Sequence, residues 1–155
     1  MLPLTSPNTY ATLGMKESPQ YLIAQLPLPP LTVEGFMQRL LQWANAKDGH
    51  ARLVTYLNAH NVNLACEDEE YLKVLQGADL LYADGMGVVW AWRRLGQALP
   101  ERVNAGDLIE EFCQRAAERN LSIYLLGSFP EVAEGAAQAW QAKAPGLRIA
   151  GCRNG

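Results

Sequence analysis

Residues 80–89 read Leu80-Leu81-Tyr82-Ala83-Asp84-Gly85-Met86-Gly87-Val88-Val89 and determine the expected fold. The apolar run 80–83 predicts a short strand, and the residues from Val88 onward predict a helix that ends at Gly96. Asp84 then lies at the C-terminal end of the strand, where open α/β sheets carry their functional groups. A second signal, the polar stretch 101–108, follows within a short distance. Together the two stretches predict an enzyme.

Short apolar runs and amphipathic segments alternate on both sides of this stretch. We expect strands at 21–24, 53–57, 80–83, 122–126 and 147–150, and helices after Thr32, over 62–75, over 88–95, from Asp107 to Asn120 and over 131–143. Thr32 is expected to cap the first helix, and Asp107 the fourth with Glu110 as its capping-box partner. Such alternation predicts an α/β, Rossmann-like fold with a mainly parallel sheet flanked by helices.

The two ends of the sequence differ from this pattern. Prolines restrict the backbone near the start, at Pro3, Pro7, Pro19, Pro27, Pro29 and Pro30. We expect residues 1–20 to form a flexible, proline-rich arm and residues 21–155 to form the α/β domain. The last expected strand runs into the final residues with no helix after it, so we expect the domain to be truncated at its C-terminal end. The alternative is that this strand is an edge strand covered by the earlier helices.

Composition excludes several classes of function. The 155 residues are 49% hydrophobic with a net charge of −3, which suits a globular core and disfavours non-specific binding of nucleic acid. No apolar run approaches the ~20 residues of a membrane span. Cys66, Cys113 and Cys152 are widely spaced and odd in number, which predicts reduced thiols in a cytoplasmic protein and no zinc site.

Three loops are expected at the C-terminal ends of strands: 58–60, 84–87 and 127–128. Because parallel strands end at one edge of their sheet, we expect these loops to face one cleft. Helix N-termini at that edge suit a diphosphate, and Gly85 and Gly87 allow its close approach. The alternative is that Asp84-Gly85 forms only a turn.

Gly85 and Gly87 have the spacing of the first two glycines in a dinucleotide-binding fingerprint. Trp90 stands where that fingerprint needs its third glycine, and Asp84 precedes the first glycine, where the pyrophosphate would approach. Nicotinamide and flavin binding are therefore disfavoured. His60 has no matching second histidine, and no pair of acidic residues of the Asp-x-Asp type occurs, so we expect no metal and no cofactor.

The region from Asn58 to Gly155 carries a set of short motifs in a specific order. They are Asn58 at the end of a strand, 78–80 leading into 84–89, Pro100-Glu101-Arg102-Val103, Asp107-Leu108, Tyr124-Leu125-Leu126-Gly127, 145–149 and the terminal Gly155. In this order and spacing the region resembles the first two-thirds of the WecG/TagA/CpsF family of bacterial glycosyltransferases.

The resemblance implies an inverting transfer of a hexose or N-acetylhexosamine, such as N-acetylmannosamine, from a UDP-sugar donor to a polyprenyl-diphosphate-linked glycan acceptor. The setting is cell-surface polysaccharide synthesis, of exopolysaccharide or teichoic acid. The resemblance makes Asp84 the catalytic base, and the expected substrate-binding residues are Asn58, His60, Gly85, Gly87, Arg102, Gly127 and Ser128. It places the enzyme at the cytoplasmic face of the plasma membrane, with peripheral contact mainly through a C-terminal region beyond Gly155. The oligomeric state is left open, a homo-oligomer included.

Several positions depart from the family pattern. Tyr56 stands where the family commonly has a small residue, Ala105 displaces a glycine to Gly106, and Ser128 replaces the second glycine of a turn. These departures leave the sugar open and favour the exopolysaccharide branch. The alternative function is a non-catalytic α/β module that binds a nucleotide sugar. Arg102 also has an alternative role as a surface partner of Glu101 or Asp107.

Overall fold

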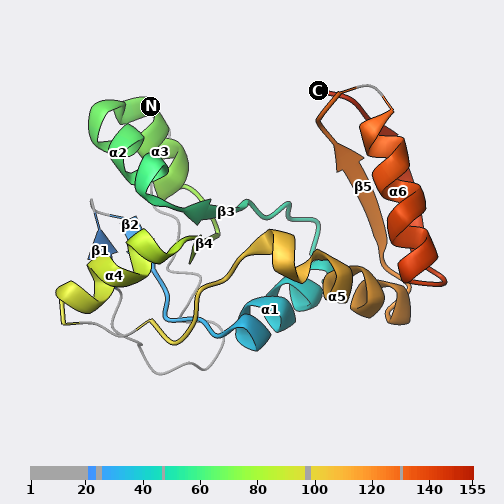
Figure 1. Cartoon of the computed structure of the whole chain (residues 1–155), viewed down its shortest axis with the longest axis horizontal. Coiled ribbons are helices and arrows are strands. Elements are labelled where there is room, and N and C mark those ends of the chain that lie inside the picture. Colours follow the sequence, from blue (N-terminus) through green and yellow to red (C-terminus); the bar gives the residue numbers. More distant parts are fainter. Residues whose placement is uncertain (1–20, 24–25, 47, 97–98, 130) are drawn as a thin grey trace. The chain divides into compact units, whose positions relative to one another are not determined.

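The computed structural model describes residues 21–23, 26–46, 48–96, 99–129 and 131–155, and these form an α/β structure (Figure 1). The expected arm at 1–20 lies outside the described residues. Along the chain come β1 (Tyr21–Ile23), β2 (Leu26–Leu28), α1 (Val33–Asn45), β3 (Val54–Leu57), α2 (Ala59–Glu67), α3 (Glu69–Gln76), β4 (Leu80–Ala83), α4 (Met86–Arg94), α5 (Ala105–Glu118), β5 (Ser122–Leu126), α6 (Val132–Lys143) and β6 (Arg148–Arg153).

The described strands pair two by two. β3 and β4 are parallel, with Val54 opposite Leu80, and β5 and β6 are parallel, with an irregularity between Ile123 and Tyr124. β1 and β2 form an antiparallel pair that the sequence did not predict, because Pro27 argues against a strand. A parallel strand, a helix and a second parallel strand are the units of the Rossmann-like α/β fold, which confirms the expected fold class.

The chain divides into two compact units, each with its own core. The first unit comprises the residues up to Gly35 and His50–Val103, and the second comprises Phe36–Gly49 and Asn104–Gly155. A core cluster of the first unit is formed by Leu26, Leu28, Leu57, Ala65, Leu75, Leu81, Ala83, Val88, Val89, Trp92 and Leu99. A core cluster of the second is formed by Cys113, Ala116, Ala144 and Leu147.

The second unit packs α5 and α6 against the β5–β6 pair. Ile109 and Ala117 of α5, Trp140 of α6 and Ile149 of β6 border its core. Burial raises the pKa of the Cys113 thiol in this core. All three cysteines of the chain are free, as the spacing predicts.

Asp68 divides the single helix that the sequence predicts over 62–75. The aspartate ends α2, and its carboxylate accepts hydrogen bonds from the backbone N–H groups of Glu70 at 2.9 Å and Tyr71 at 3.0 Å, which caps α3. An aspartate competes for such bonds more effectively at a cap than inside a helix. The prediction of one helix over this segment was therefore wrong.

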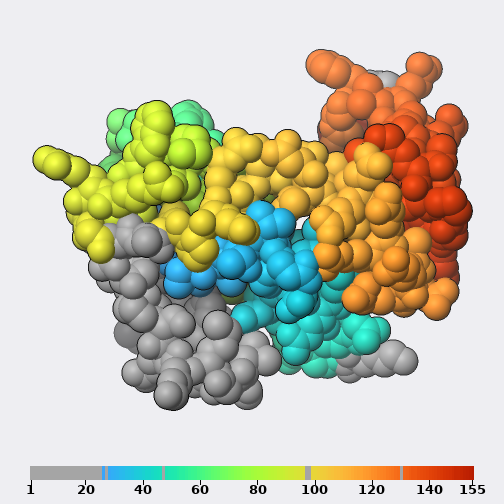
Figure 2. Space-filling model, turned by 60° about the horizontal axis from the view of Figure 1, so that its bottom comes forward, coloured from blue at the N-terminus to red at the C-terminus, as the bar shows by residue number. Residues whose placement is uncertain are grey.

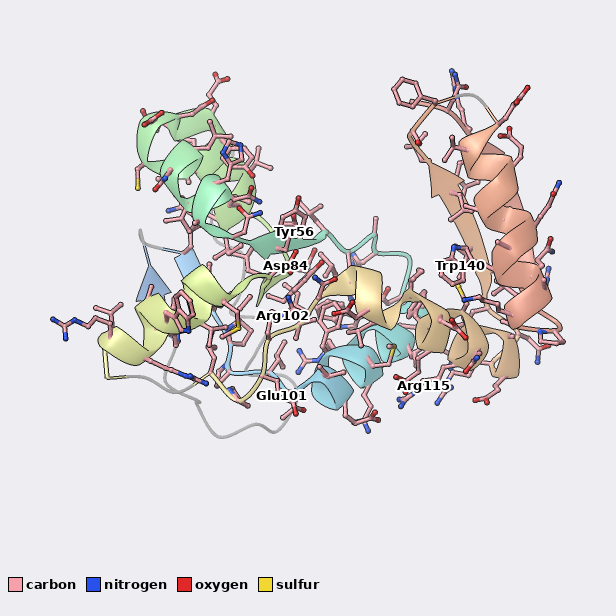
Figure 3. All side chains as sticks on the ribbon, viewed as in Figure 1. Tyr56, Asp84, Glu101, Arg102, Arg115 and Trp140 are labelled. Atoms are coloured by element: carbon pink, nitrogen blue, oxygen red, sulfur yellow. The ribbon has the colours of Figure 1, made fainter. Side chains whose placement is uncertain are left out.

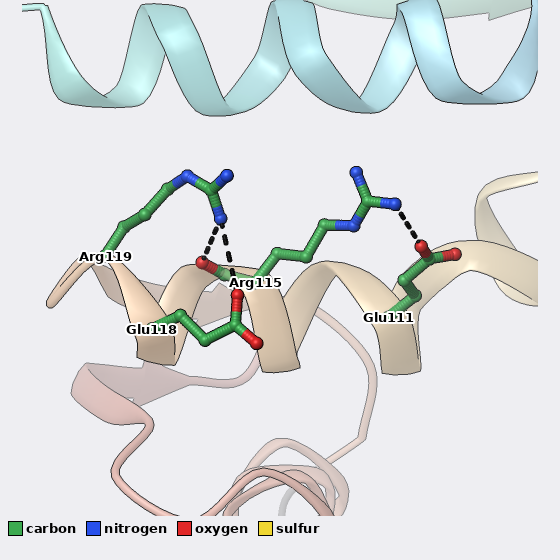
Figure 4. A network of polar contacts seen from close by, with 4 residues as sticks. All are labelled: Glu111, Arg115, Glu118 and Arg119. Carbon is green, nitrogen blue, oxygen red and sulfur yellow. Dashed lines mark hydrogen bonds and ion pairs between the residues drawn. The ribbon is translucent and has the colours of Figure 1, made fainter.

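Asn104, and not Asp107, caps α5. Its side-chain oxygen accepts from the N–H groups of Gly106 at 2.9 Å and Asp107 at 3.3 Å, so the helix begins before the expected cap. Asn120 has a left-handed φ of 55° just beyond the helix, which agrees with its expected role as terminator. The ion pairs Glu111–Arg115 and Glu118–Arg119 lie along α5 (Figure 4).

The cap that the sequence predicts for α1 is confirmed. The N–H of Gly35 donates to the Thr32 hydroxyl oxygen at 3.0 Å. The N–H of Val33, the first residue of the helix, donates to a Glu101 carboxylate oxygen at 2.5 Å. The start of α1 is thus capped twice, once locally and once from a distant part of the first unit.

Candidate active site

Asp84 lies at the C-terminal end of the β3–β4 pair. Its backbone N–H donates to the carbonyl of Leu57 at 2.9 Å, which continues the parallel ladder one residue beyond β4. The residue is partly buried. Helices α2 and α4 begin at this same edge, directly after β3 and just after Asp84. The first unit thus places the carboxylate where the sequence predicts it.

The loops after β3 and β4 lie side by side. A methyl group on Gly85 would lie 3.9 Å from Cβ of Asn58, and one on Gly87 would lie 3.8 Å from Cβ of Ala59. Gly85 has a φ of 100°, a backbone conformation that other residues rarely adopt. No side chain caps the start of α4 at Gly85, so its first N–H groups face the edge with the positive end of the helix dipole.

The two asparagines after β3 hold the start of α2. Asn58 caps the helix, with its side-chain oxygen accepting from the N–H of Asn61 at 2.9 Å. Asn61 is buried, and its amide donates to the carbonyl of Tyr56 at 3.1 Å. Sequence reasoning missed Asn61, although the Asn-x-x-Asn spacing is that of a helix cap and its third residue. The expected role of Asn58 toward a sugar stays a prediction beside this structural role.

Tyr82 is a second residue that sequence reasoning missed. It is buried and lies opposite Tyr56 in the β3–β4 register, with the ring centroids 6.1 Å apart. Burial, with a further contribution from the negative charge of Asp84 and then from Tyr56, raises the pKa of Tyr82 to about 12. The Asp84 carboxylate and the neutral Tyr82 phenol are therefore electrostatic neighbours.

Arg102 is held beside the end of β4. The N–H of Val103 donates to the carbonyl of Ala83 at 3.1 Å, and this bond brings the backbone that follows Arg102 to the end of β4, where Asp84 follows Ala83 (Figure 3). Arg102 is exposed. Its neighbour Glu101 has a carboxylate oxygen bound to the start of α1.

The remaining expected site residues fall in two places. His60 is exposed in the first turn of α2, at the edge that carries Asp84. Gly127 and Ser128 belong to the second unit and follow β5, where the N–H of Gly127 donates to the carbonyl of Arg153 at 2.9 Å. Gly127 and Ser128 have φ values of 122° and 71°. The convergence of all three loops on one cleft stays a prediction.

Three further features of the described residues bear on function. A groove in the second unit is lined by Gln38, Leu41, Gln42, Asn45, Ala46 and Arg119, and none of these is an expected site residue. Among the described residues, no group of three His, Cys, Asp or Glu side chains could hold a metal ion. None of the helices that the structure describes is long and apolar enough to cross a membrane.

A comparison with known protein families finds one family that matches most of the chain. A model of the glycosyl transferase WecG/TagA/CpsF family matches residues 21–155. The chain belongs to this family. The resemblance that the sequence carries from Asn58 onward is thereby confirmed, and the WecG/TagA/CpsF match extends it to residue 21 at the start of β1.

Relatives in this family are similar over most of the chain. An N-acetylglucosaminyldiphosphoundecaprenol N-acetyl-beta-D-mannosaminyltransferase of Staphylococcus aureus strain NCTC 8325 is 34% identical over 108 residues, which cover 70% of this chain and 42% of the relative. The enzyme of the same name from strain MRSA252 gives the same identity and coverage. The aligned region thus spans less than half the length of these relatives.

Proposed function

We propose that this chain carries the catalytic edge of an inverting glycosyltransferase, with Asp84 as the general base. The observation that supports this most directly is the family match over 21–155, which includes Asp84 and both loops beside it. Proposed substrates are a UDP-linked N-acetylhexosamine of the N-acetylmannosamine type and a polyprenyl-diphosphate-linked acceptor. The name of the staphylococcal relatives, which contains a diphosphoundecaprenol-linked N-acetylglucosamine, supports this choice of acceptor.

The proposed reaction needs one proton transfer and one displacement. The Asp84 carboxylate takes the proton of an acceptor hydroxyl as that oxygen forms a bond to the anomeric carbon. The bond from the anomeric carbon to the donor diphosphate breaks, and UDP leaves with the electron pair. Attack from the face opposite UDP inverts the configuration at that carbon.

The negative charge that develops on the leaving UDP needs compensation. Two positively charged or polarised groups lie at the C-terminal edge of the β3–β4 pair and can provide it. The N–H groups at the uncapped start of α4 present the positive end of a helix dipole. Arg102 adds a guanidinium that suits a diphosphate. We propose that these groups replace a metal ion, so that turnover persists in EDTA. Asn58, His60, Gly127 and Ser128 are proposed to position the two substrates.

The variant Asp84→Asn tests the base directly. Asparagine keeps the shape of the side chain and loses its basicity, so transfer should fall by ~10²–10⁴-fold while UDP-sugar affinity changes only a few fold. Transfer is measured with the full-length gene product and a lipid-diphosphate-linked N-acetylglucosamine acceptor, and UDP-sugar affinity by calorimetry.

Asp79→Asn is the matched control. Asp79 flanks the same strand at its other end, where its carboxylate accepts from the N–H of Leu53 at 2.8 Å. This variant should keep transfer within a few fold of the unmodified protein. Unreduced transfer by Asp84→Asn would place the base elsewhere. An unmodified protein that binds UDP-sugar without any transfer would instead be the non-catalytic module.

A further inference from the structure

The outer face of α4 is a feature that the proposed function does not explain. The inner face of the helix packs into the core of the first unit with Val88, Val89 and Trp92. On the other side, Met86 is 41% exposed and Trp90 is 63% exposed. Arg94 follows at the same spacing of four residues, so the three side chains form one stripe along the helix. Leu95, which ends the helix, is 62% exposed.

This face is basic as well as apolar. Arg93 and Arg94 occupy the last turn of α4 and are exposed. No ion pair among the described residues involves either side chain. Figure 2 shows the α4 region, in yellow-green, open at the molecular surface. We name the set Met86, Trp90, Arg93 and Arg94 the α4 outer face.

One acidic run of the first unit lies away from the start of α4. The acidic run 67–70 lies where α2 ends and α3 begins. The start of α2 is the part that meets α4, since Ala59 is the neighbour of Gly87. At 1.5 Å per residue, the nine-residue α2 separates the run from the start of α4 by about 12 Å.

We propose that the α4 outer face docks on a bilayer surface that contains anionic phospholipid. An exposed tryptophan beside arginines is the composition of a helix that lies in the membrane interface, where the indole sits at the headgroups and the cations meet anionic lipid. A second copy of the chain fits less well, because one nine-residue helix face offers far less than the ~800 Å² per partner of a stable interface.

The inference rests on the proposed function for its purpose. A polyprenyl-diphosphate acceptor presents its reactive glycan at the headgroup level of a bilayer. α4 begins two residues after Asp84, so docking of this helix brings the carboxylate to that level. The chain itself thereby contributes a membrane contact, in addition to the one that the family resemblance places beyond Gly155.

Co-sedimentation with vesicles tests whether the positive charges of Arg93 and Arg94 bind anionic lipid. The 155-residue chain should bind vesicles of phosphatidylglycerol and phosphatidylcholine and should bind pure phosphatidylcholine weakly. The double variant Arg93→Glu with Arg94→Glu should weaken binding to the anionic vesicles by about tenfold or more. The control Arg148→Glu with Arg153→Glu makes the same change in net charge at two exposed arginines of β6 and should bind like the unmodified chain.

Quenching of tryptophan fluorescence by brominated phospholipid tests whether the α4 outer face is the side of the chain that meets the bilayer. Tryptophan fluorescence of the unmodified chain should fall on binding, and Trp90→Phe should remove most of that quenching. Trp140→Phe, which changes a partly buried tryptophan of α6, should leave the quenching in place. Circular dichroism confirms that each variant is folded.

Three results would overturn the docking proposal. The first is a chain that does not bind anionic vesicles, and the second is binding that the β6 control loses as fully as the α4 variant. The third is a dimer in solution that Trp90→Ala dissolves, which would assign the face to a second copy. Asp84→Asn should bind vesicles normally, so failure of the catalytic proposal and failure of the docking proposal give different results.

Discussion

At the scale of single residues, Gly85 and Gly87 lie only two positions apart but carry different constraints. Gly85 has a φ of 100° and a ψ of 145°, and Gly87 lies within α4 with only ordinary contacts around a methyl group. The conformation of Gly85 lets the chain turn from β4 into α4 directly after Asp84. Only Gly85 is therefore required by the backbone.

We predict opposite effects of alanine at these two positions. Gly85→Ala should destabilise the protein by about 1–3 kcal/mol, because alanine is strained at this φ and ψ. Gly87→Ala should stabilise it by up to about 1 kcal/mol, because alanine favours a helix. Urea unfolding measures both, and equal effects of the two substitutions would contradict the argument.

Tyr82 makes stability depend on pH in the alkaline range. Its pKa is about 12 in the folded chain, above the ordinary value of 10.0 for tyrosine, so between these two values the folded state keeps a proton that the unfolded state loses. Stability should thus fall by about 2–3 kcal/mol as the pH rises from 10 to 12. Tyr82→Phe should flatten this slope. Denaturant unfolding at several pH values measures it, and an unchanged slope in the variant would assign the effect to other groups.

At the scale of elements, the helix caps determine where the secondary structure begins and ends. Asn58, Asp68 and Asn104 each accept backbone N–H bonds at the start of a helix. Asp68 also ends the preceding helix, so one side chain separates α2 from α3.

Asn104 should be the more important of the two candidate caps of α5. Asn104→Ala should cost about 1 kcal/mol, because the N–H groups of Gly106 and Asp107 lose their acceptor. Asn104→Asp keeps an acceptor oxygen and should cost little. Thermal unfolding followed by circular dichroism measures both variants. A loss in Asn104→Asp as large as in Asn104→Ala would show that the cap bond is not the source of the stability.

At the scale of the whole molecule, the two units have separate apolar cores. Among the described residues, the core cluster around Leu81 draws its members from the first unit, and the core cluster around Leu147 draws its members from the second. Asp84 and its adjacent loops belong to the first unit, and Gly127 and Ser128 belong to the second.

Core substitutions should therefore act on one unit at a time. Leu81→Ala should destabilise the first unit by about 2–5 kcal/mol and speed amide hydrogen exchange in β3, α2 and α4. Leu147→Ala should do the same for α5, β5 and α6. Hydrogen exchange with mass spectrometry resolves the segments. Equal acceleration in both units by either variant would show that the chain opens as one body.

The sequence by itself determined the order of most strands and helices and the place of Asp84 after β4, since apolar periodicity and turn residues act over a few neighbours. It misplaced the start of α5 and joined α2 to α3, because several side chains there compete for the same backbone groups. Only the tertiary structure decided the β1–β2 pair, the division into two units, the burial of Tyr82 and the contact between the loops at Asn58 and Gly85. These features depend on contacts between residues far apart in the chain, and no local pattern specifies which distant partner a strand or loop will meet.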